Sequence, residues 1–279
     1  MGSRALVPKR KGWGLVLTML LGFGAVLPLM SLTGCGGVSP AEPVPAPTAP
    51  PVVNVTLLDG VTGASLAGMP SPVGAPLDVQ RAGYLPRLTL VPRDGAVFLW
   101  PITVDQAWSL TLVYHEFSPA RRLVRWTRAE LTISPEFPQA ALDEINSTGA
   151  VRLRYGTPAD IDSRVDPQRL PTATANAAAS ITFTGDTITH ATILLRDEGR
   201  LQNVRTARHE LGHALGFGHS SRHDDLMWPV NDGGGSFTHD ERVLLVMMYG
   251  HRRPGNAAPD NDVALGAASG AVRTIMVVD

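Results

Sequence analysis

Cysteine is almost absent from this sequence. Its 279 residues contain one, Cys35. A single thiol excludes an internal disulfide, a zinc site made of cysteines and an iron–sulfur cluster. Aromatic residues are also few, at 6%, but 44% of the residues are apolar and only 18% are charged. That composition supports a packed core, and the length suits one large or two modest domains.

Lysine is nearly absent too, and the charges are unevenly distributed. Lys9 and Lys11 are the only lysines. With Arg4 and Arg10 they place four positive charges before residue 35, where no acidic residue occurs. Of the 24 basic residues, 20 therefore remain from residue 35 onward against 25 acidic ones, a net charge of −5. This balance argues against a general nucleic-acid binder.

Residues 1–34 have the pattern of an export signal. A basic segment precedes an uncharged apolar run at residues 15–30, and the sequence LTGC follows at residues 32–35. As a helix, that run spans roughly 24 Å, which is less than the ~30 Å hydrocarbon core of a bilayer. A cleaved signal peptide is therefore favoured over a membrane-spanning anchor.

The LTGC sequence resembles a bacterial lipobox. The resemblance implies that Cys35 is lipidated and becomes the first residue of an exported, lipid-anchored protein at the outer membrane or cell surface of a bacterium. The alternatives are a plain signal peptide with an incidental thiol and an uncleaved anchor. Residues 35–51 are rich in proline, so we expect an extended tether after the lipid.

Short apolar segments between Gly and Pro punctuation predict strands in residues 52–116. They lie at 52–58, 88–91, 97–100 and 110–114. We expect a small all-β sandwich domain. The segments at 62–63, 66–68 and 82–84 weakly resemble carboxypeptidase-regulatory-like domains, and an unrelated β module is the alternative.

Strand and helix patterns alternate from residue 117 onward. Strands are expected at 129–133, 151–155, 181–183 and 193–195, and a helix at 138–146. Asp160, Asp162 and Asp166 fall between these segments, where a solvated loop is favoured over a calcium site. We expect residues 253–279 to form a flexible tail, whose final residues 272–278 have the composition of one strand.

Eleven residues, HELGHALGFGH at 209–219, concentrate the chemistry. His209 and His213 are four apart on a predicted helix, so both side chains project from one face and can bind one metal ion. Gly216 lets the chain leave the helix, which brings His219 back as a third ligand. Three histidines leave a fourth position for water, as in catalytic zinc sites, and Glu210 lies beside it as a general base.

This motif is the signature of the metzincin zinc metallopeptidases, and the chain resembles their matrixin branch most closely. Ser220 follows the third histidine, and Met227 in the sequence LMWP matches the methionine turn beneath the metal. A core methionine without that role is the alternative for Met227. Thr238 and Glu241 form a capping box for a last helix that ends near Gly250, which is similar to matrixin domains.

The resemblance implies an α+β catalytic domain at residues 117–252, with a twisted mixed sheet, a backing helix, an active-site helix and a small C-terminal lobe. It also implies one catalytic Zn²⁺ ion and a protein or peptide substrate laid as an extra strand along a sheet edge. Because Cys35 is the only thiol, the cysteine-switch propeptide of this family is excluded. Trp228 and Val230 depart from common matrixins, so no side-chain preference is transferred.

The predicted function is zinc-dependent endopeptidase activity on extracytoplasmic proteins. The alternatives are a zinc hydrolase acting on peptidoglycan crosslinks and a non-catalytic surface-binding lipoprotein, although an intact Glu210 disfavours the latter. We expect a monomer that is anchored to the membrane through the lipid on Cys35 and binds no nucleic acid. His223 is predicted to be a polar loop residue, and Tyr249 to pack within the last helix.

Overall fold

The computed structural model describes residues 48–102, 112–114, 121–230, 232–263 and 272–278. The chain divides into two units, Met1–Pro47 and Thr48–Asp279, and all described residues lie in the second. Cys35, the signal segment 1–34 and most of the tether 35–51 lie outside the described residues, as does the boundary expected at 116/117. Within the described part, no helix is long and apolar enough to cross a membrane.

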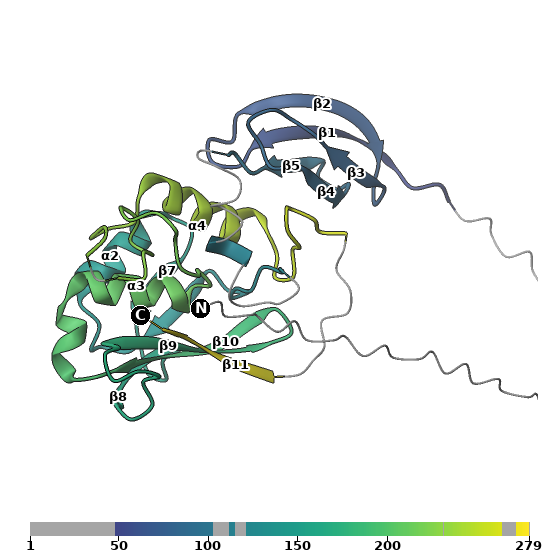
Figure 1. Cartoon of the computed structure of the whole chain (residues 1–279). Helices are drawn as coiled ribbons and strands as arrows, with labels where there is room; N and C mark the ends of the chain where they lie inside the picture. The colour runs from purple at the N-terminus through teal and green to yellow at the C-terminus, as the bar shows by residue number, and fades with distance from the viewer. Residues whose placement is uncertain (1–47, 103–111, 115–120, 231, 264–271, 279) are drawn as a thin grey trace, which may run out of the picture. The chain divides into compact units, whose positions relative to one another are not determined.

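A six-stranded mixed sheet lies at the centre of the larger part of the fold (Figure 1). Its strand order is β11-β9-β10-β8-β6-β7. The pairs β10–β8, β8–β6 and β6–β7 are parallel, whereas β9 runs antiparallel to both β10 and β11. The strands are β6 Glu130–Ile133, β7 Arg152–Tyr155, β8 Ile161–Val165, β9 Ala177–Thr184, β10 Thr187–Leu195 and β11 Val272–Val278. The predicted mixed sheet of an α+β fold is confirmed.

Among the described residues, this sheet is accompanied by the helices α2 Gln139–Ser147, α3 Val204–Ala214 and α4 His239–His251 and by the 3₁₀ turn η1 Glu198–Gln202. Helix α2 begins after Pro138, and Gly149 has a positive φ of 70° just beyond its end. The helix predicted at 138–146 is therefore confirmed within a residue. Helix α3 packs against β9, β10 and α2, which gives it the central position in this part of the molecule.

Two small sheets precede this part. The strands β1 Val52–Asp59, β2 Ser65–Pro72 and β5 Ala96–Leu99 form one sheet, and β3 Pro76–Val79 pairs with β4 Arg87–Leu90 in the other. Apolar residues of both sheets share one buried cluster, which includes Val55, Leu57, Leu77 and Val79. The assignment of residues 52–116 to a sandwich domain, and its likeness to carboxypeptidase-regulatory domains, stay predictions.

Two predictions about local structure are wrong. Leu112–Tyr114 is helical rather than part of a strand at 110–114, and its side chains are buried in the larger core, away from the two small sheets. A short buried apolar run fits either state, so its sequence does not decide between them. The segment with Asp160 and Asp162 contains strand β8, where a loop was expected.

The prediction of a flexible tail at residues 253–279 is also wrong for the part of this range that the structure describes. Asn256 and Asp260 are fully buried, and the Asn256 side chain donates hydrogen bonds to Asp260 and Asp262. Residues 272–278 form β11, as their composition indicates. The tail differs from a flexible linker because its short polar side chains form buried hydrogen bonds and ion pairs.

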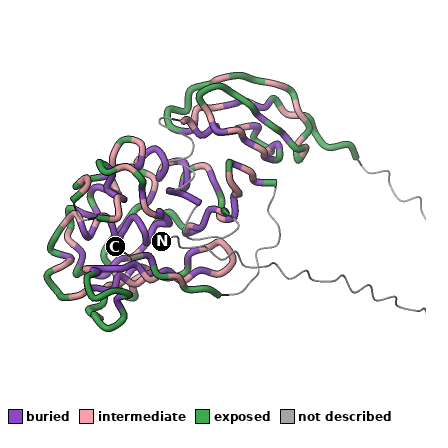
Figure 2. The backbone as a smooth tube through the Cα atoms, viewed as in Figure 1, coloured by how far each residue is buried: buried purple, intermediate pink, exposed green. Residues whose placement is uncertain are grey.

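These partners connect the small sheets to the segment after α4. Arg87 on β4 forms ion pairs with Asp260 at 2.8 Å and with Asp262 at 2.6 Å. Arg252, directly after α4, pairs with Asp260 at 2.7 Å and donates to the carbonyl of Phe98 on β5. Figure 2 shows the buried stretches concentrated around the helices and the larger sheet, while β2 is mostly exposed.

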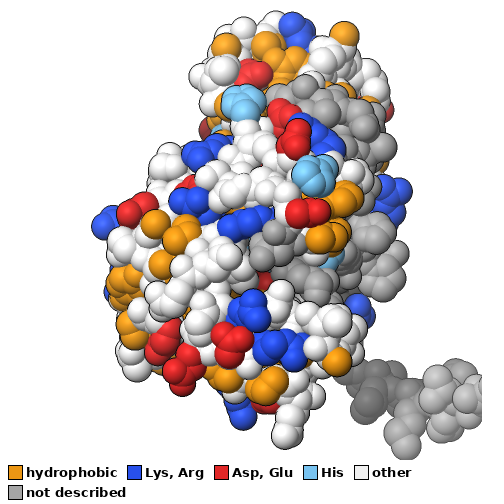
Figure 3. All heavy atoms as spheres, turned by 60° about the vertical axis from the view of Figure 1, so that its left-hand side comes forward, with side chains coloured by type: hydrophobic (Ala, Val, Ile, Leu, Met, Phe, Trp, Pro, Cys, Tyr) orange, Lys and Arg blue, Asp and Glu red, His pale blue; other side chains and the backbone are white. Residues whose placement is uncertain are grey.

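Charged side chains of both signs are interspersed on the face shown in Figure 3. Small groups of basic and of acidic side chains are scattered over it, and apolar side chains lie between them. Neither sign of charge dominates that face.

Candidate metal centre

Helix α3 carries the first part of the site, and its start is fixed by one side chain. The Oδ1 atom of Asn203 accepts hydrogen bonds from the backbone N–H groups of Arg205 at 3.0 Å and Thr206 at 3.3 Å. These are two of the four N–H groups that a helix leaves without partners inside the helix. Ala207 and Leu211 are buried on the inner face of α3, so the helix is held at the sheet by packing.

The three histidines of the motif meet at one point. The Nε2 atoms of His209 and His213 are 3.0 Å apart, and one ring nitrogen from each of these residues and from His219 lies within 4.8 Å of the others. His219 reaches this point because the chain reverses at Gly216, which has a positive φ of 104°. A Cβ atom at Gly216 would lie 2.4 Å from the carbonyl oxygen of Val124, so only glycine fits.

Two backbone carbonyls fix the orientation of the helical histidines. The Nδ1 atom of His209 lies 2.6 Å from the carbonyl oxygen of Leu226, and that of His213 lies 2.8 Å from the carbonyl oxygen of Phe217. Because a carbonyl only accepts, each Nδ1 carries the proton and each Nε2 offers its lone pair toward the common point. This is the arrangement of metal-ligating histidines, so the donor set fits a zinc ion.

Glu210 follows the first histidine on α3. Its side chain is 0% exposed, which places a carboxyl group in the protein interior at the turn of the helix that bears two of the histidines. Burying an ionised carboxyl group costs folding free energy, so such groups are usually paired or belong to a functional site.

Met227 lies under α3. A Cβ atom at Gly212 would lie 2.3 Å from the Met227 sulfur. The methionine therefore packs against α3 at Gly212, which lies between His209 and His213 in the sequence. The backbone N–H of Ser220 donates to the Met227 carbonyl at 2.7 Å, which joins the turn to the residue after the third histidine. The residue expected on a turn beneath the metal is therefore placed beside the metal-site helix.

Two acidic residues support this turn, and the sequence analysis did not assign that role to them. Glu241 is buried and accepts hydrogen bonds from the backbone N–H groups of Leu226 at 3.2 Å and Met227 at 2.9 Å. Asp225 is also buried and accepts from the hydroxyls of Ser220 and Thr238. The capping box at Thr238 signalled Glu241 as a helix-start residue, but nothing near Asp225 indicated its partners.

The segment after Met227 is fastened to α3. Arg205 donates to the carbonyl of Gly234 at 3.0 Å and to that of Val230 at 2.9 Å. Arg208, one turn further along the helix, donates to the carbonyl of Gly235 at 2.8 Å. The segment that contains Val230 and Gly234 is thereby held by the helix that carries His209 and His213.

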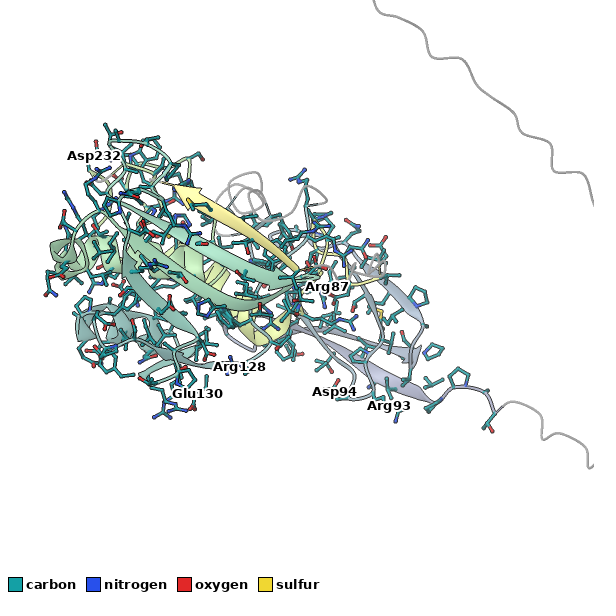
Figure 4. All side chains as sticks on the ribbon, turned by 90° about the horizontal axis from the view of Figure 1, so that it is seen from below. Arg87, Arg93, Asp94, Arg128, Glu130 and Asp232 are labelled. Carbon is teal, nitrogen blue, oxygen red and sulfur yellow. The ribbon has the colours of Figure 1, made fainter. Side chains whose placement is uncertain are left out.

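Other residues considered at the sequence level lie elsewhere. The side chain of His223 is 59% exposed and lies 3.6 Å from Asp232, in keeping with a polar loop residue. Figure 4 labels Asp232 at the end of the molecule away from Arg87 and Arg93. Tyr249 is buried and donates from its hydroxyl to the Leu215 carbonyl at 2.8 Å, so it packs as predicted, and burial raises its pKa.

Comparison with known proteins supports the family suggested by the motif. Residues 152–249 match the family model Peptidase_M10, described as matrixin. The match runs from β7 to α4 and includes the three histidines, Glu210 and Met227. A search of curated proteins finds no match. Residues 152–249 of this chain are therefore similar to the matrixin family of metallopeptidases.

Proposed function

We propose that this protein is a zinc-dependent endopeptidase that hydrolyses peptide bonds of extracytoplasmic proteins. The observation that carries the proposal is the convergence of His209, His213 and His219, with two of their Nδ1 atoms held by backbone carbonyls. A set of three neutral imidazoles holds a zinc ion and leaves a position for water, which is the requirement for catalysis rather than for a structural site.

When bound, the zinc ion supplies a Lewis acid that makes water acidic near neutral pH and polarises the carbonyl of the scissile bond. Glu210 accepts the proton of the attacking water. It then delivers that proton to the nitrogen of the leaving amine, so that its carboxylate is restored at the end of the reaction. Burial of Glu210 excludes bulk water from this exchange.

The role of Glu210 is tested by Glu210→Gln. The variant keeps the shape of the side chain but has no basic oxygen to accept the proton, so kcat on a denatured protein substrate should fall by about 10²–10⁴-fold. Bound zinc, measured by metal analysis, should stay at one ion per chain because the histidines are unchanged. The matched control is Glu198→Gln on the exposed turn η1, which should retain activity.

Two outcomes would contradict this proposal. One is Glu210→Gln retaining full activity. The other is a zinc-loaded wild-type protein that cleaves no member of a broad peptide library. Release of crosslinked fragments from peptidoglycan, without cleavage of proteins, would instead support the alternative hydrolase.

We further propose that the protein is attached to a bacterial membrane by a lipid on Cys35. The proposal is supported by the basic segment, apolar run and LTGC sequence of residues 1–35. Cys35→Ser should move the protein from the membrane fraction to the soluble fraction of the cell envelope. Unchanged retention in the membrane fraction would refute lipid attachment at this residue.

A further inference from the structure

The last strand of the chain lies on the sheet edge beside the metal-site helix. Helix α3 packs against β9 and β10, whereas β7, at the opposite edge, packs against α2. Beyond β9 there is one further strand, β11, which runs along it (Figure 1). The edge nearest the metal centre is therefore covered by residues 272–278.

The pairing of β11 with β9 is extensive and in register. It runs antiparallel from Val272 opposite Thr184 to Val278 opposite Ala178. On one face, the hydroxyls of Thr182 and Thr274 lie 3.0 Å apart. On the other, Val277 is only 4% exposed and belongs to the core that includes residues of α3.

An extended peptide that joins a sheet binds through the N–H and C=O groups of its edge strand. On β9 the outward-facing groups are the ones that β11 uses. A substrate laid along β9 and residues 272–278 therefore compete for the same backbone groups. In the view of Figure 4, the arrow of β11 points toward the part of the chain that holds Asp232, in the segment after Met227.

We infer that β11 is an internal competitor of the substrate, and that its release from β9 frees this edge of the sheet for a substrate strand. This inference rests on the proposed function and concerns the regulation of the same site. It supplies a means of latency in a chain whose single thiol excludes a cysteine switch.

The contacts of β11 are consistent with a strand that can separate from β9. On its outer face, Val272 is 68% exposed and Met276 is 37% exposed, so little apolar surface is buried there. On its inner face, Val277 is buried and Ile275 is partly buried. Among the described strands, β11 pairs with β9 alone, whereas β9 and β10 each pair with two strands. It therefore opens at a lower free energy than they do.

A reversible crosslink tests the inference in the full-length chain. Thr182→Cys and Thr274→Cys, combined with Cys35→Ser, place the only two thiols at directly paired residues. Paired residues in antiparallel strands have Cα atoms about 4.5–5.5 Å apart, which a disulfide can span. Oxidation should lower kcat/KM on a protein substrate by more than about tenfold, because few chains then offer a free edge. Reduction should restore it.

The matched control crosslinks β9 to its other neighbour. Ser180→Cys and Thr192→Cys, again with Cys35→Ser, join paired residues of β9 and β10 and leave β11 free. Oxidation of this control should leave kcat/KM unchanged. If the β9–β11 crosslinked protein is as active as its reduced form, the inference is wrong.

A second variant pair releases β11 without a crosslink. Val277→Asp puts a charge at a buried position and should detach the strand, whereas Met276→Asp changes its exposed neighbour. Val277→Asp should raise kcat/KM, mainly through a lower KM, and Met276→Asp should not. Equal activity of Val277→Asp and wild type, with a native circular dichroism spectrum, would overturn the inference.

Binding separates the regulation from the catalysis. A labelled peptide with the sequence of residues 272–278 should bind Val277→Asp but not the oxidised β9–β11 crosslinked protein. If no form cleaves any peptide although all hold zinc, the proposed function fails, and peptide binding still decides the role of β11. Equal binding to both proteins would refute competition at this edge.

Discussion

A single hydrogen atom in place of a side chain decides the fit between α3 and the turn beneath it. Gly212 lies between His209 and His213 in the sequence, and a Cβ atom there would lie 2.3 Å from the sulfur of Met227. Glycine in the middle of a helix costs about 1 kcal/mol relative to alanine. Glycine at this position therefore lowers the stability of the helix but leaves the space in which Met227 packs against it.

Gly212→Ala should destabilise the protein by about 1–3 kcal/mol, because the added methyl group overfills a packed site. The control is Gly250→Ala in α4, where a Cβ atom meets nothing within 4 Å, and we expect a gain of about 0.5–1 kcal/mol there. Urea unfolding of the two variants compares them directly. A stabilised Gly212→Ala protein would show that Met227 moves aside without cost.

At this scale the sequence indicated which three histidines lie together. His209 and His213 follow the helical period, and a glycine at residue 216 breaks it, so spacing alone placed three ligands together. Spacing does not report contacts between residues far apart in the chain. The carbonyl of Leu226 that orients His209 comes from a residue 17 positions away, and such partners depend on the tertiary fold.

At the scale of secondary structure elements, Glu241 joins the start of α4 to the methionine turn. Its Oε1 accepts from the Met227 N–H, and its Oε2 accepts from the N–H groups of Leu226 and Thr238. Burial raises the pKa of Glu241, although these backbone hydrogen bonds oppose the rise. One side chain thus fixes both the helix start and the turn that supplies the carbonyl for His209.

Glu241→Gln replaces one accepting oxygen with an NH₂ group that faces backbone donors. We expect a loss of about 2–3 kcal/mol in unfolding free energy and zinc affinity weakened by roughly tenfold through the displaced Leu226 carbonyl. The control is Asp240→Asn on the same helical turn, whose ion pair with Arg222 should contribute less than about 1 kcal/mol. Equal effects of the two variants would argue against a special role for Glu241.

The elements that the sequence missed have a common physical cause. Strand β8 has only Ile161 buried, so it shows neither an apolar run nor a regular alternation. Its stability comes from its pairing with β10 and β6, which a local pattern does not contain. Helix α4 was predictable because its capping box is local to residues 238–241.

At the scale of the whole molecule, buried ion pairs join the small sheets to the chain after α4. Asp262 pairs with Arg87 and accepts a hydrogen bond from Asn256. Burial alone would raise the pKa of Asp262, but the charge of Arg87 and the hydrogen bond from Asn256 outweigh it, so the pKa is lowered below 3.8. The folded state therefore binds this proton less readily than the unfolded chain does.

A lowered carboxyl pKa stabilises the fold above the unfolded value and stops doing so as the pH falls through the folded value. Asp262→Asn should cost about 3 kcal/mol at pH 7, because it leaves Arg87 with one fewer buried partner. The difference in unfolding free energy between wild type and variant should shrink below about pH 4. A difference that stays constant from pH 7 to pH 3 would contradict this account.

The same ion pairs bear on how the protein loses its structure. Arg87 precedes the domain boundary expected at 116/117, whereas Asp260 and Asp262 follow helix α4. If either part unfolded alone, the other would keep a buried charge without its ion-pair partner. Parts joined in this way melt together. We therefore expect the β strands at 52–99 and the matrixin-like region to unfold as one cooperative unit, so that heating gives a single transition in calorimetry rather than two.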